Sequence, residues 1–203
     1  MRISLQDAGK RFNREWIFRH FSYEFQPSGT YAITGPNGSG KSTLLQVIAG
    51  STLHSEGKIL YRSSEKDVVV EDAYIHLSIA APYLELIEEM TATEFLKMHF
   101  KFKNPLESIE SILQQIGLEK AAHKQIRYFS SGMKQRLKLG QAFFSETPVL
   151  LLDEPTTNLD AEGIELYKNL VSNYTKNRLL LVSSNEPEEY KFCEEVIRIG
   201  DYK

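Results

Sequence analysis

Gly35-Pro36-Asn37-Gly38-Ser39-Gly40-Lys41-Ser42-Thr43 is the most informative segment of this chain. It follows a short strand-like run, residues 30–34, and leads into residues 44–48, which have the pattern of a helix. Glycines in such a turn let backbone N–H groups point inward around an anion, and the helix that follows directs its positive end to the same place. Lys41 supplies a positive charge for terminal phosphates, and the Ser42 hydroxyl can ligate Mg²⁺. The segment predicts a phosphate-binding loop; the alternative is a turn that only joins a strand to a helix.

Short apolar runs on both sides of this loop predict strands. The expected strands cover residues 3–5, 16–25, 31–34, 57–61, 67–70, 74–80, 149–154, 179–183 and 196–199. The early runs are separated by turn residues, which is typical of antiparallel hairpins. Two of the later runs, residues 149–154 and 179–183, are apolar throughout, as in a parallel sheet covered by helices.

The middle of the chain has a helical pattern instead. Thr91, with Glu94 three residues later, predicts a capped helix whose apolar face includes Phe102. Pro105 predicts the start of a second helix, and Ser130 predicts the cap of a third. This pattern indicates a helical block within an α/β chain.

The sequence therefore predicts an α/β fold in a single domain. The mainly parallel core sheet, with an N-terminal antiparallel β subdomain, is expected to comprise about residues 1–82 and 147–203. The inserted helical subdomain is expected over about residues 83–146, and a further helix over residues 161–174.

Composition narrows the possible functions. The 203 residues are 41% hydrophobic and 25% charged, with a formal net charge of −3, so there is no electrostatic argument for binding nucleic acid. The single cysteine, Cys193, excludes a disulfide within the chain. No apolar run approaches the ~20 residues that cross a bilayer, and the first residues lack the apolar region of a secretory signal. We expect any role at a membrane to depend on a partner.

A pair of acidic residues follows the apolar run at residues 149–152 and is a second candidate site. Asp153 ends this run and can hold Mg²⁺ through a water molecule. Glu154, the next residue, can orient or deprotonate a water molecule that attacks a phosphate. Many buried strands end in acidic residues, so this pair gains its meaning from the phosphate-binding loop.

Between the loop and this acidic pair lies Phe129-Ser130-Ser131-Gly132-Met133, followed by a basic, glutamine-containing stretch, residues 134–137. Here the sequence resembles the ATP-binding cassette (ABC) ATPases, whose signature is Leu-Ser-Gly-Gly-Gln. A serine cap and a glycine at a helix N-terminus form a second anion site, which suits that role. Residues 154–160 are similar to the family's D-loop, which places Asp160 at a subunit boundary.

The resemblance implies a P-loop NTPase fold of the ABC type and a dimer with two ATP molecules at its interface. Residues expected to contact ATP are Phe12, Gly35, Pro36, Asn37, Gly38, Ser39, Gly40, Lys41, Ser42, Thr43, Ser130, Ser131, Gly132 and Asp160. Of these, Ser130 and Gly132 would contact ATP from across the interface. Mg²⁺ would be placed by Ser42 and Asp153, Glu154 would be the general base, and Lys41 would be a catalytic residue that holds the phosphates. Phe12 would stack on adenine; its alternative is a core position on an edge strand.

The sequence departs from the family at two positions. The Q-loop glutamine is missing, because no glutamine occurs between Gln46 and Gln114. The switch histidine is missing too, because no histidine follows His123, and Asn185 occupies its position. An asparagine can donate a hydrogen bond but cannot carry a proton. We therefore expect Mg²⁺-dependent ATP hydrolysis that is slow.

The resemblance also implies partners and a location. We expect the chain to be the ATP-binding subunit of an ABC transporter, cytoplasmic and peripheral on the inner face of the membrane. It would bind a separate transmembrane permease subunit and a second ATPase subunit, most simply an identical chain. Two alternatives remain open: an ABC ATPase that works outside transport, and an ATP-gated dimerisation switch with little turnover.

Overall fold

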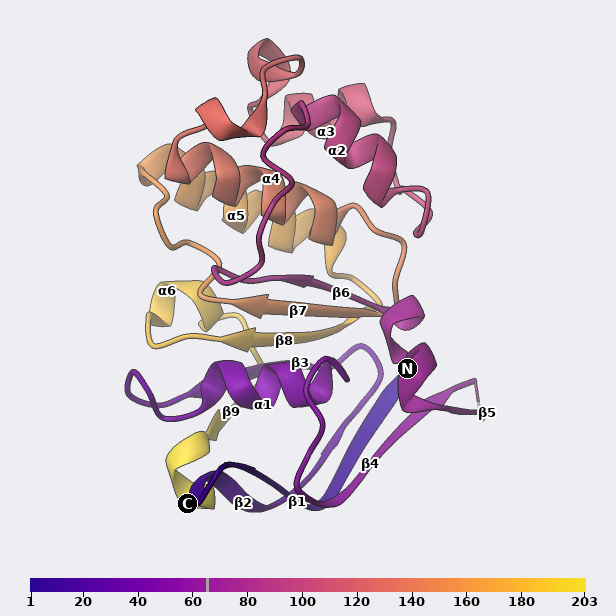
Figure 1. Cartoon of the computed structure of the whole chain (residues 1–203), viewed down its shortest axis with the longest axis vertical. Coiled ribbons are helices and arrows are strands. Elements are labelled where there is room, and N and C mark those ends of the chain that lie inside the picture. The colour runs from indigo at the N-terminus through magenta and orange to yellow at the C-terminus, as the bar shows by residue number, and fades with distance from the viewer. Residues whose placement is uncertain (65) are drawn as a thin grey trace. The chain divides into compact units, whose positions relative to one another are not determined.

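The computed structural model describes residues 1–64 and 66–203 (Figure 1). Its strands are β1 (Arg2–Phe12), β2 (Glu15–Phe25), β3 (Thr30–Thr34), β4 (Glu56–Ser63), β5 (Lys66–Val68), β6 (Leu77–Ala80), β7 (Val149–Asp153), β8 (Leu179–Ser183) and β9 (Glu195–Arg198). Its α-helices are α1 (Lys41–Ile48), α2 (Ala92–His99), α3 (Ile109–Gln115), α4 (Ser131–Phe143), α5 (Ala161–Tyr174) and α6 (Pro187–Tyr190). Short 3-10 helices cover Val70–His76, Glu119–Ala121, Ile126–Tyr128 and Ile199–Tyr202.

These elements form two compact units. The sheet unit consists of Met1–Ile79, Pro148–Asp153 and Asn177–Lys203. The helical unit consists of Ala80–Thr147 and Glu154–Lys176. Asp153 and Glu154, adjacent in the chain, therefore fall in different units.

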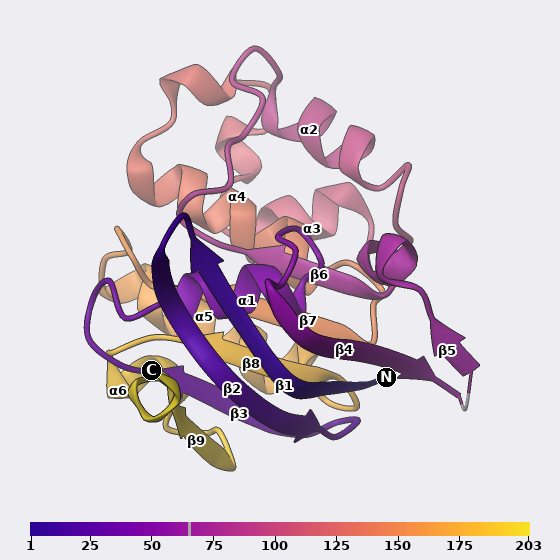
Figure 2. The ribbon, with the colours of Figure 1, turned by 60° about the horizontal axis from the view of Figure 1, so that its bottom comes forward.

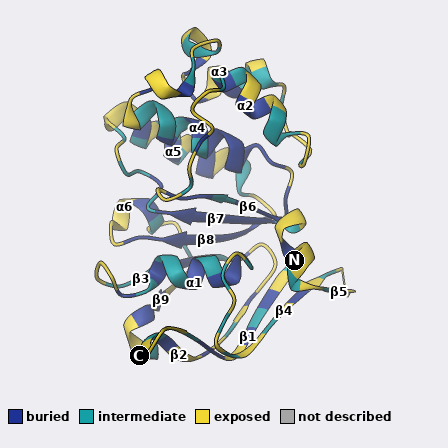
Figure 3. Ribbon diagram, viewed as in Figure 1, coloured by how far each residue is buried: buried dark blue, intermediate teal, exposed yellow. Residues whose placement is uncertain are grey.

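The larger sheet of the sheet unit has the strand order β6-β7-β8-β3-β9. β3 pairs in parallel with β8 and β9, and β7 pairs in parallel with β8. Every residue of β7 and β8 is buried, and both strands are dark blue in Figure 3. Their uninterrupted Leu and Val runs suit a strand that has no face in water. The parallel sheet expected from the sequence is confirmed.

Helix α1 packs between the two sheets of this unit. Its residues Leu44, Leu45 and Ile48 belong to one hydrophobic cluster with Leu151 and Leu181 of the parallel sheet. Each fully buried leucine or isoleucine contributes about 1.5–3 kcal/mol relative to an exposed one. This packing fixes the start of α1 at the end of β3.

The smaller sheet has the order β2-β1-β4-β5 and is antiparallel (Figure 2). In β1 the buried Ile3 and Leu5 alternate with the partly exposed Ser4, as in a sheet with one face on the core. Phe21 and Phe25 of β2 lie on the same buried side. The N-terminal antiparallel strands are therefore confirmed.

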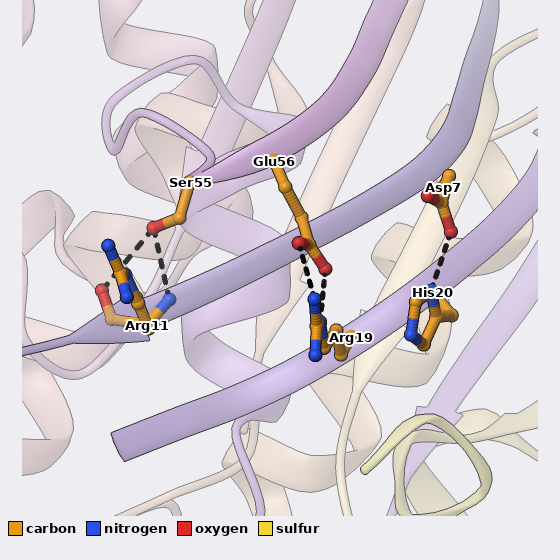
Figure 4. Close-up of polar contacts among 6 residues, drawn as sticks. All are labelled: Asp7, Arg11, Arg19, His20, Ser55 and Glu56. Carbon is orange, nitrogen blue, oxygen red and sulfur yellow. Dashed lines mark hydrogen bonds and ion pairs between the residues drawn. The ribbon is translucent and has the colours of Figure 1, made fainter. Parts of the chain in front are cut away.

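Polar side chains pair beside the irregular stretch of β1, where its register with β2 shifts (Figure 4). Asp7 and His20 both have positive φ, 50° and 56°, and His20 Nδ1 lies 2.7 Å from Asp7 Oδ1. Arg19 donates two hydrogen bonds to the Glu56 carboxylate, at 2.7 and 3.1 Å. These side chains are exposed, so water and salt screen the pairs and they add little to stability.

The helices of the helical unit begin at side-chain caps. Thr91 and Glu94 form a capping box at α2, as predicted. Ser108 caps α3, Ser130 caps α4 as predicted, and Asp160 caps α5. No helix that the structure describes is both long enough and apolar enough to cross a membrane.

Three local predictions are wrong. The strand expected over residues 74–80 begins only at Leu77, because residues 70–76 form a 3-10 helix that leaves Tyr74 59% exposed. Pro105 does not start a helix; α3 begins after Ser108, whose hydroxyl accepts a hydrogen bond from a backbone N–H. α2 ends at His99, so Phe102 lies beyond it and is 77% exposed. Local sequence signals therefore did not show where these three elements begin or end.

His99 gives the helical unit a pH-dependent stability. Burial, and then the positive charge of Lys103, lowers the pKa of His99 from 6.5 to about 4. Between these two values the unfolded chain binds a proton that the folded chain does not, so stability falls as the pH falls. We expect a loss of roughly 1 kcal/mol per pH unit from about pH 6.5 towards pH 4.

Urea unfolding at pH 7 and pH 5 would test this expectation. The difference between the two free energies of unfolding should be smaller in His99→Gln than in the unchanged chain, because glutamine does not titrate. An equal pH dependence in both proteins would show that His99 is not responsible.

Candidate functional site

The predicted phosphate-binding loop lies between β3 and α1, where its backbone conformation requires glycines. Gly35, Gly38 and Gly40 have φ values of 148°, 76° and 104°, which favour glycine. A Cβ atom at Gly40 would lie 2.4 Å from Cγ2 of Ile17, while a Cβ at Gly38 would meet nothing within 4 Å. The loop is therefore packed on one side and open on the other.

The start of α1 is suited to an anion. Gly40 stands at the N-cap position and no side chain caps the helix, so the first backbone N–H groups are available to a ligand. Lys41 is only 4% exposed, and its Nζ donates to Gly35 O at 2.7 Å and to Pro36 O at 3.4 Å. Ser39 Oγ is buried and has no hydrogen-bond partner among the described residues. This chemistry fits a bound phosphate.

Asp153 and Asn185 both lie where strands of the parallel sheet end, Asp153 at the end of β7 and Asn185 just after β8. β7, β8 and β3 are parallel neighbours, so their carboxyl ends lie at one edge. Asp153 ends β7 and is 1% exposed, and it pairs in register with Ser183, the last residue of β8. Ser183 Oγ has no hydrogen-bond partner among the described residues. A carboxylate and hydroxyls at this edge, with Ser42 at the start of α1, are ligands that suit Mg²⁺.

Asn185 is attached to the phosphate-binding loop. Its Oδ1 accepts a hydrogen bond from Gly35 N at 3.3 Å, and its Nδ2 donates to Asn37 Oδ1 at 3.0 Å. The sequence placed Asn185 at this site but gave no indication of these contacts. Asn37, expected only as a loop residue, therefore also orients Asn185.

Glu154 has an unusual backbone conformation. Its φ is +43°, which is uncommon for a residue other than glycine, asparagine or aspartate. It is half-buried, and the Thr157 hydroxyl lies 3.5 Å from its Oε2. Strained residues cluster at active sites, so this outlier supports a functional hypothesis for Glu154.

Phe12 lies at the end of β1 and is 49% exposed. The ammonium group of Lys10 is 4.7 Å from the centre of its ring. β1 is an inner strand of its sheet, with β2 and β4 on either side. The alternative that Phe12 is a core residue on an edge strand is therefore wrong, and the ring is accessible to a ligand.

The signature-like segment forms a hollow within the helical unit. Ser130 Oγ accepts a hydrogen bond from Met133 N at 3.2 Å, and both Ser130 and Ser131 are exposed at the tip of α4. The hollow has a volume of about 400 Å³ and is lined by Ser130, Ser131, Gly132, Met133, Arg136, Asn158, Leu159 and Asp160. The structure therefore brings Ser130, Ser131, Gly132 and Asp160 together around one hollow.

Asp160 already has partners within its own unit. Its Oδ1 accepts from Gly163 N at 2.8 Å, as the cap of α5, and from an Nη atom of Arg136 at 3.1 Å. The Gly163 hydrogen bond, followed by Arg136, lowers the pKa of Asp160. Asp160 thus has a structural role at the start of α5, and this role does not depend on a second subunit.

Comparison with known proteins decides the family. The sequence profile of the ABC transporter family matches residues 18–157. The chain belongs to the ABC transporter family. The segment from β2 to the residues after Asp153 carries this match, so the phosphate-binding loop, the signature-like segment and the acidic pair all lie within it.

Individual relatives agree with this assignment. The uncharacterized ABC transporter ATP-binding protein YdbJ of Bacillus subtilis is 26% identical over 204 residues, which cover 97% of this chain and 66% of that protein. The cytochrome c biogenesis ATP-binding export protein CcmA of Bartonella henselae is 29% identical over 203 residues, covering 96% and 95%. The chain thus spans about two thirds of one relative and nearly all of the other.

The ABC fold is also confirmed by a solved structure. The dimeric structure of MJ0796, described as a bacterial ABC transporter cassette, matches with a TM-score of 0.81 at 20% identity, over 98% of this chain and 95% of that one. The predicted α/β fold of the ABC type is therefore right.

Sequence reasoning missed two residues of this ABC cassette. Gln135 and Arg136 follow the signature-like segment and were given no role, yet both bind the D-loop segment, residues 155–160. A basic residue next to a helix start gives no indication of a partner 24 residues away in the sequence. Only the folded helical unit shows the pair.

Proposed function

We propose that this chain is the ATP-hydrolysing subunit of an ABC transporter, with ATP bound between two such subunits. The main support is the loop site in the sheet unit: an uncapped helix start, a buried Lys41 and a buried Asp153 at one sheet edge. The helical unit adds a separate hollow at Ser130 and Gly132, which suits the terminal phosphate of a nucleotide held by another chain.

Each residue has a distinct role in this proposal. Lys41 and the loop N–H groups bind the β- and γ-phosphates, and Phe12 stacks on adenine. Ser42 and Asp153 hold Mg²⁺, which when bound neutralises charge on the phosphate oxygens. Glu154 takes a proton from the attacking water as the water oxygen forms its bond to the γ-phosphorus; the bond from that phosphorus to the bridging oxygen breaks, and ADP leaves with the electron pair.

Slow turnover is proposed because the Q-loop glutamine is absent and because Asn185 stands in place of the switch histidine. Its amide is engaged with Gly35 N and Asn37, and it cannot become cationic. It therefore orients the loop and contributes little charge stabilisation to the γ-phosphate.

A groove in the helical unit supports the proposal of a transmembrane partner. Its volume is about 350 Å³, and it is lined by Pro82, Leu84, Glu85, Leu86, Glu88, Lys134 and Lys138. Lys138 donates to Pro82 O at 2.8 Å, and Lys134 forms an ion pair with Glu88. A groove lined by both leucines and charged side chains suits a short helix of a permease, which would place this chain on the cytoplasmic face of the membrane.

Isolation of the native complex tests this function. We expect the tagged chain, purified in mild detergent from its own cells, to bring down a protein with several membrane spans. Recovery of ribosomes or nucleic acid instead would favour an ABC ATPase that works outside transport. A purified chain that binds MgATP without measurable turnover would favour the ATP-gated switch.

A further inference from the structure

The first turn of α4 and the D-loop segment, residues 155–160, are joined inside one unit. Gln135 is 3% exposed, and its Nε2 donates to Pro155 O at 2.8 Å. Gly132 approaches the same segment so closely that a Cβ would lie 3.0 Å from Asn158 O. The two segments are therefore in direct contact along the hollow that they both line.

Arg136 is the charged part of this contact. Its side chain is 13% exposed, much less than that of a typical surface arginine. One Nη atom lies 3.1 Å from Asp160 Oδ1, and the other lies 3.6 Å from Glu162 Oε1. A Cβ at Gly117 would lie 2.9 Å from the guanidinium, so that glycine leaves room for it.

The planar guanidinium suits this position. It presents several N–H donors in a fixed arrangement, so it can bind two carboxylates at once, which an ammonium group cannot do with the same geometry. The guanidinium is held in place by its partial burial, while the side chains of Asp160 and Glu162 are 71% and 82% exposed, so salt partly screens the ion pair. Asp160 in turn caps α5, so the contact joins the second turn of α4 to the start of α5.

We propose that Arg136 is a positioning residue that holds the D-loop segment against the tip of α4. A nucleotide bound by a second chain then meets both segments as one preformed surface. This proposal rests on the proposed function, because it assigns the surface to a nucleotide held by a partner. It adds a residue that acts through Asp160 and need not touch the nucleotide itself.

Two variants separate the ion pair from the helix cap. Arg136→Ala removes the guanidinium, and Asp160→Ser removes the carboxylate while serine still caps α5. Arg62→Ala is the matched control, because Arg62 forms an exposed 3.0 Å ion pair with Asp67 in the sheet unit. Each variant and the Arg136/Asp160 double variant would be made in the full chain, with and without Glu154→Gln to limit hydrolysis.

Hydrogen exchange in the absence of nucleotide tests the contact itself. We expect backbone amides in residues 155–160 and in the first turn of α4 to exchange about tenfold faster in Arg136→Ala and in Asp160→Ser. The double variant should exchange no faster than either single one, because both remove the same pair. Unchanged exchange, or effects that add, would overturn the proposal.

Dimerisation with MgATP tests the positioning role. In the Glu154→Gln background, light scattering should show a dimer about tenfold weaker in Arg136→Ala, while a fluorescent ATP analogue binds one chain within twofold of the unchanged affinity. Faster exchange with an unchanged dimer would overturn the positioning role. An unaltered chain that binds MgATP but forms no dimer would overturn the proposed function instead, and the exchange measurement would still decide the contact.

Discussion

Replacing Glu154 by glutamine is expected to lower MgATP turnover by about 10²- to 10⁴-fold. Glutamine has the size of glutamate but cannot accept a proton from the attacking water. Glu154 is half-buried, has φ +43° and directly follows Asp153. Because glutamine has nearly the same shape, Glu154→Gln should keep this local conformation. MgATP affinity should stay within a few-fold, because Lys41 and the loop N–H groups are unchanged.

Steady-state phosphate release by the purified chain is the measurement. Glu165→Gln is a suitable control, since Glu165 is an exposed carboxylate on α5. It should leave turnover unchanged, which would show that loss of one negative charge is not enough. Equal rates in Glu154→Gln and the unchanged chain would remove Glu154 from the role of general base.

Much of the fold could be predicted because local signals agreed with each other. α5 covers the predicted residues 161–174, since Asp160 supplies a cap and the apolar spacing continues to Tyr174. β8 also has the predicted bounds, because an apolar run of this short length is typical of a strand buried on both faces. Where one signal stood alone, as with Pro105, the predicted start was wrong.

In the candidate site, too, some residues could be predicted from local motifs, whereas contacts between distant segments could not. Lys41 and Asp153 could be predicted because each lies beside its own motif, and the parallel order of β3, β8 and β7 brings their ends to one edge. The contact between Asn185 and Asn37 spans 148 residues, and no pattern in the sequence links the two. Arg136 was overlooked for the same reason, because its ion pair with Asp160 exists only once α4 and α5 have packed.

Removing the Lys41 side chain is expected to weaken MgATP binding by about 2–4 kcal/mol, roughly 30- to 1,000-fold in dissociation constant. Lys41 is almost fully buried at the start of α1, where its Nζ donates to Gly35 O at 2.7 Å. A phosphate at this position would gain a charge-assisted hydrogen bond from the ammonium group, and Lys41→Ala would leave that phosphate charge without its cation.

The fold should survive this change, because the loop glycines and the apolar face of α1 that packs on the sheet are untouched. Titration with a fluorescent ATP analogue would measure the loss, and unfolding by heat would confirm that Lys41→Ala remains folded. Lys58→Ala, at an exposed position of β4, is the control and should bind as the unchanged chain does. Similar affinities in Lys41→Ala and Lys58→Ala would mean that the glycine loop does not bind the triphosphate. A phosphate bound in that loop would lie close to the buried ammonium group of Lys41, so its removal must weaken binding there.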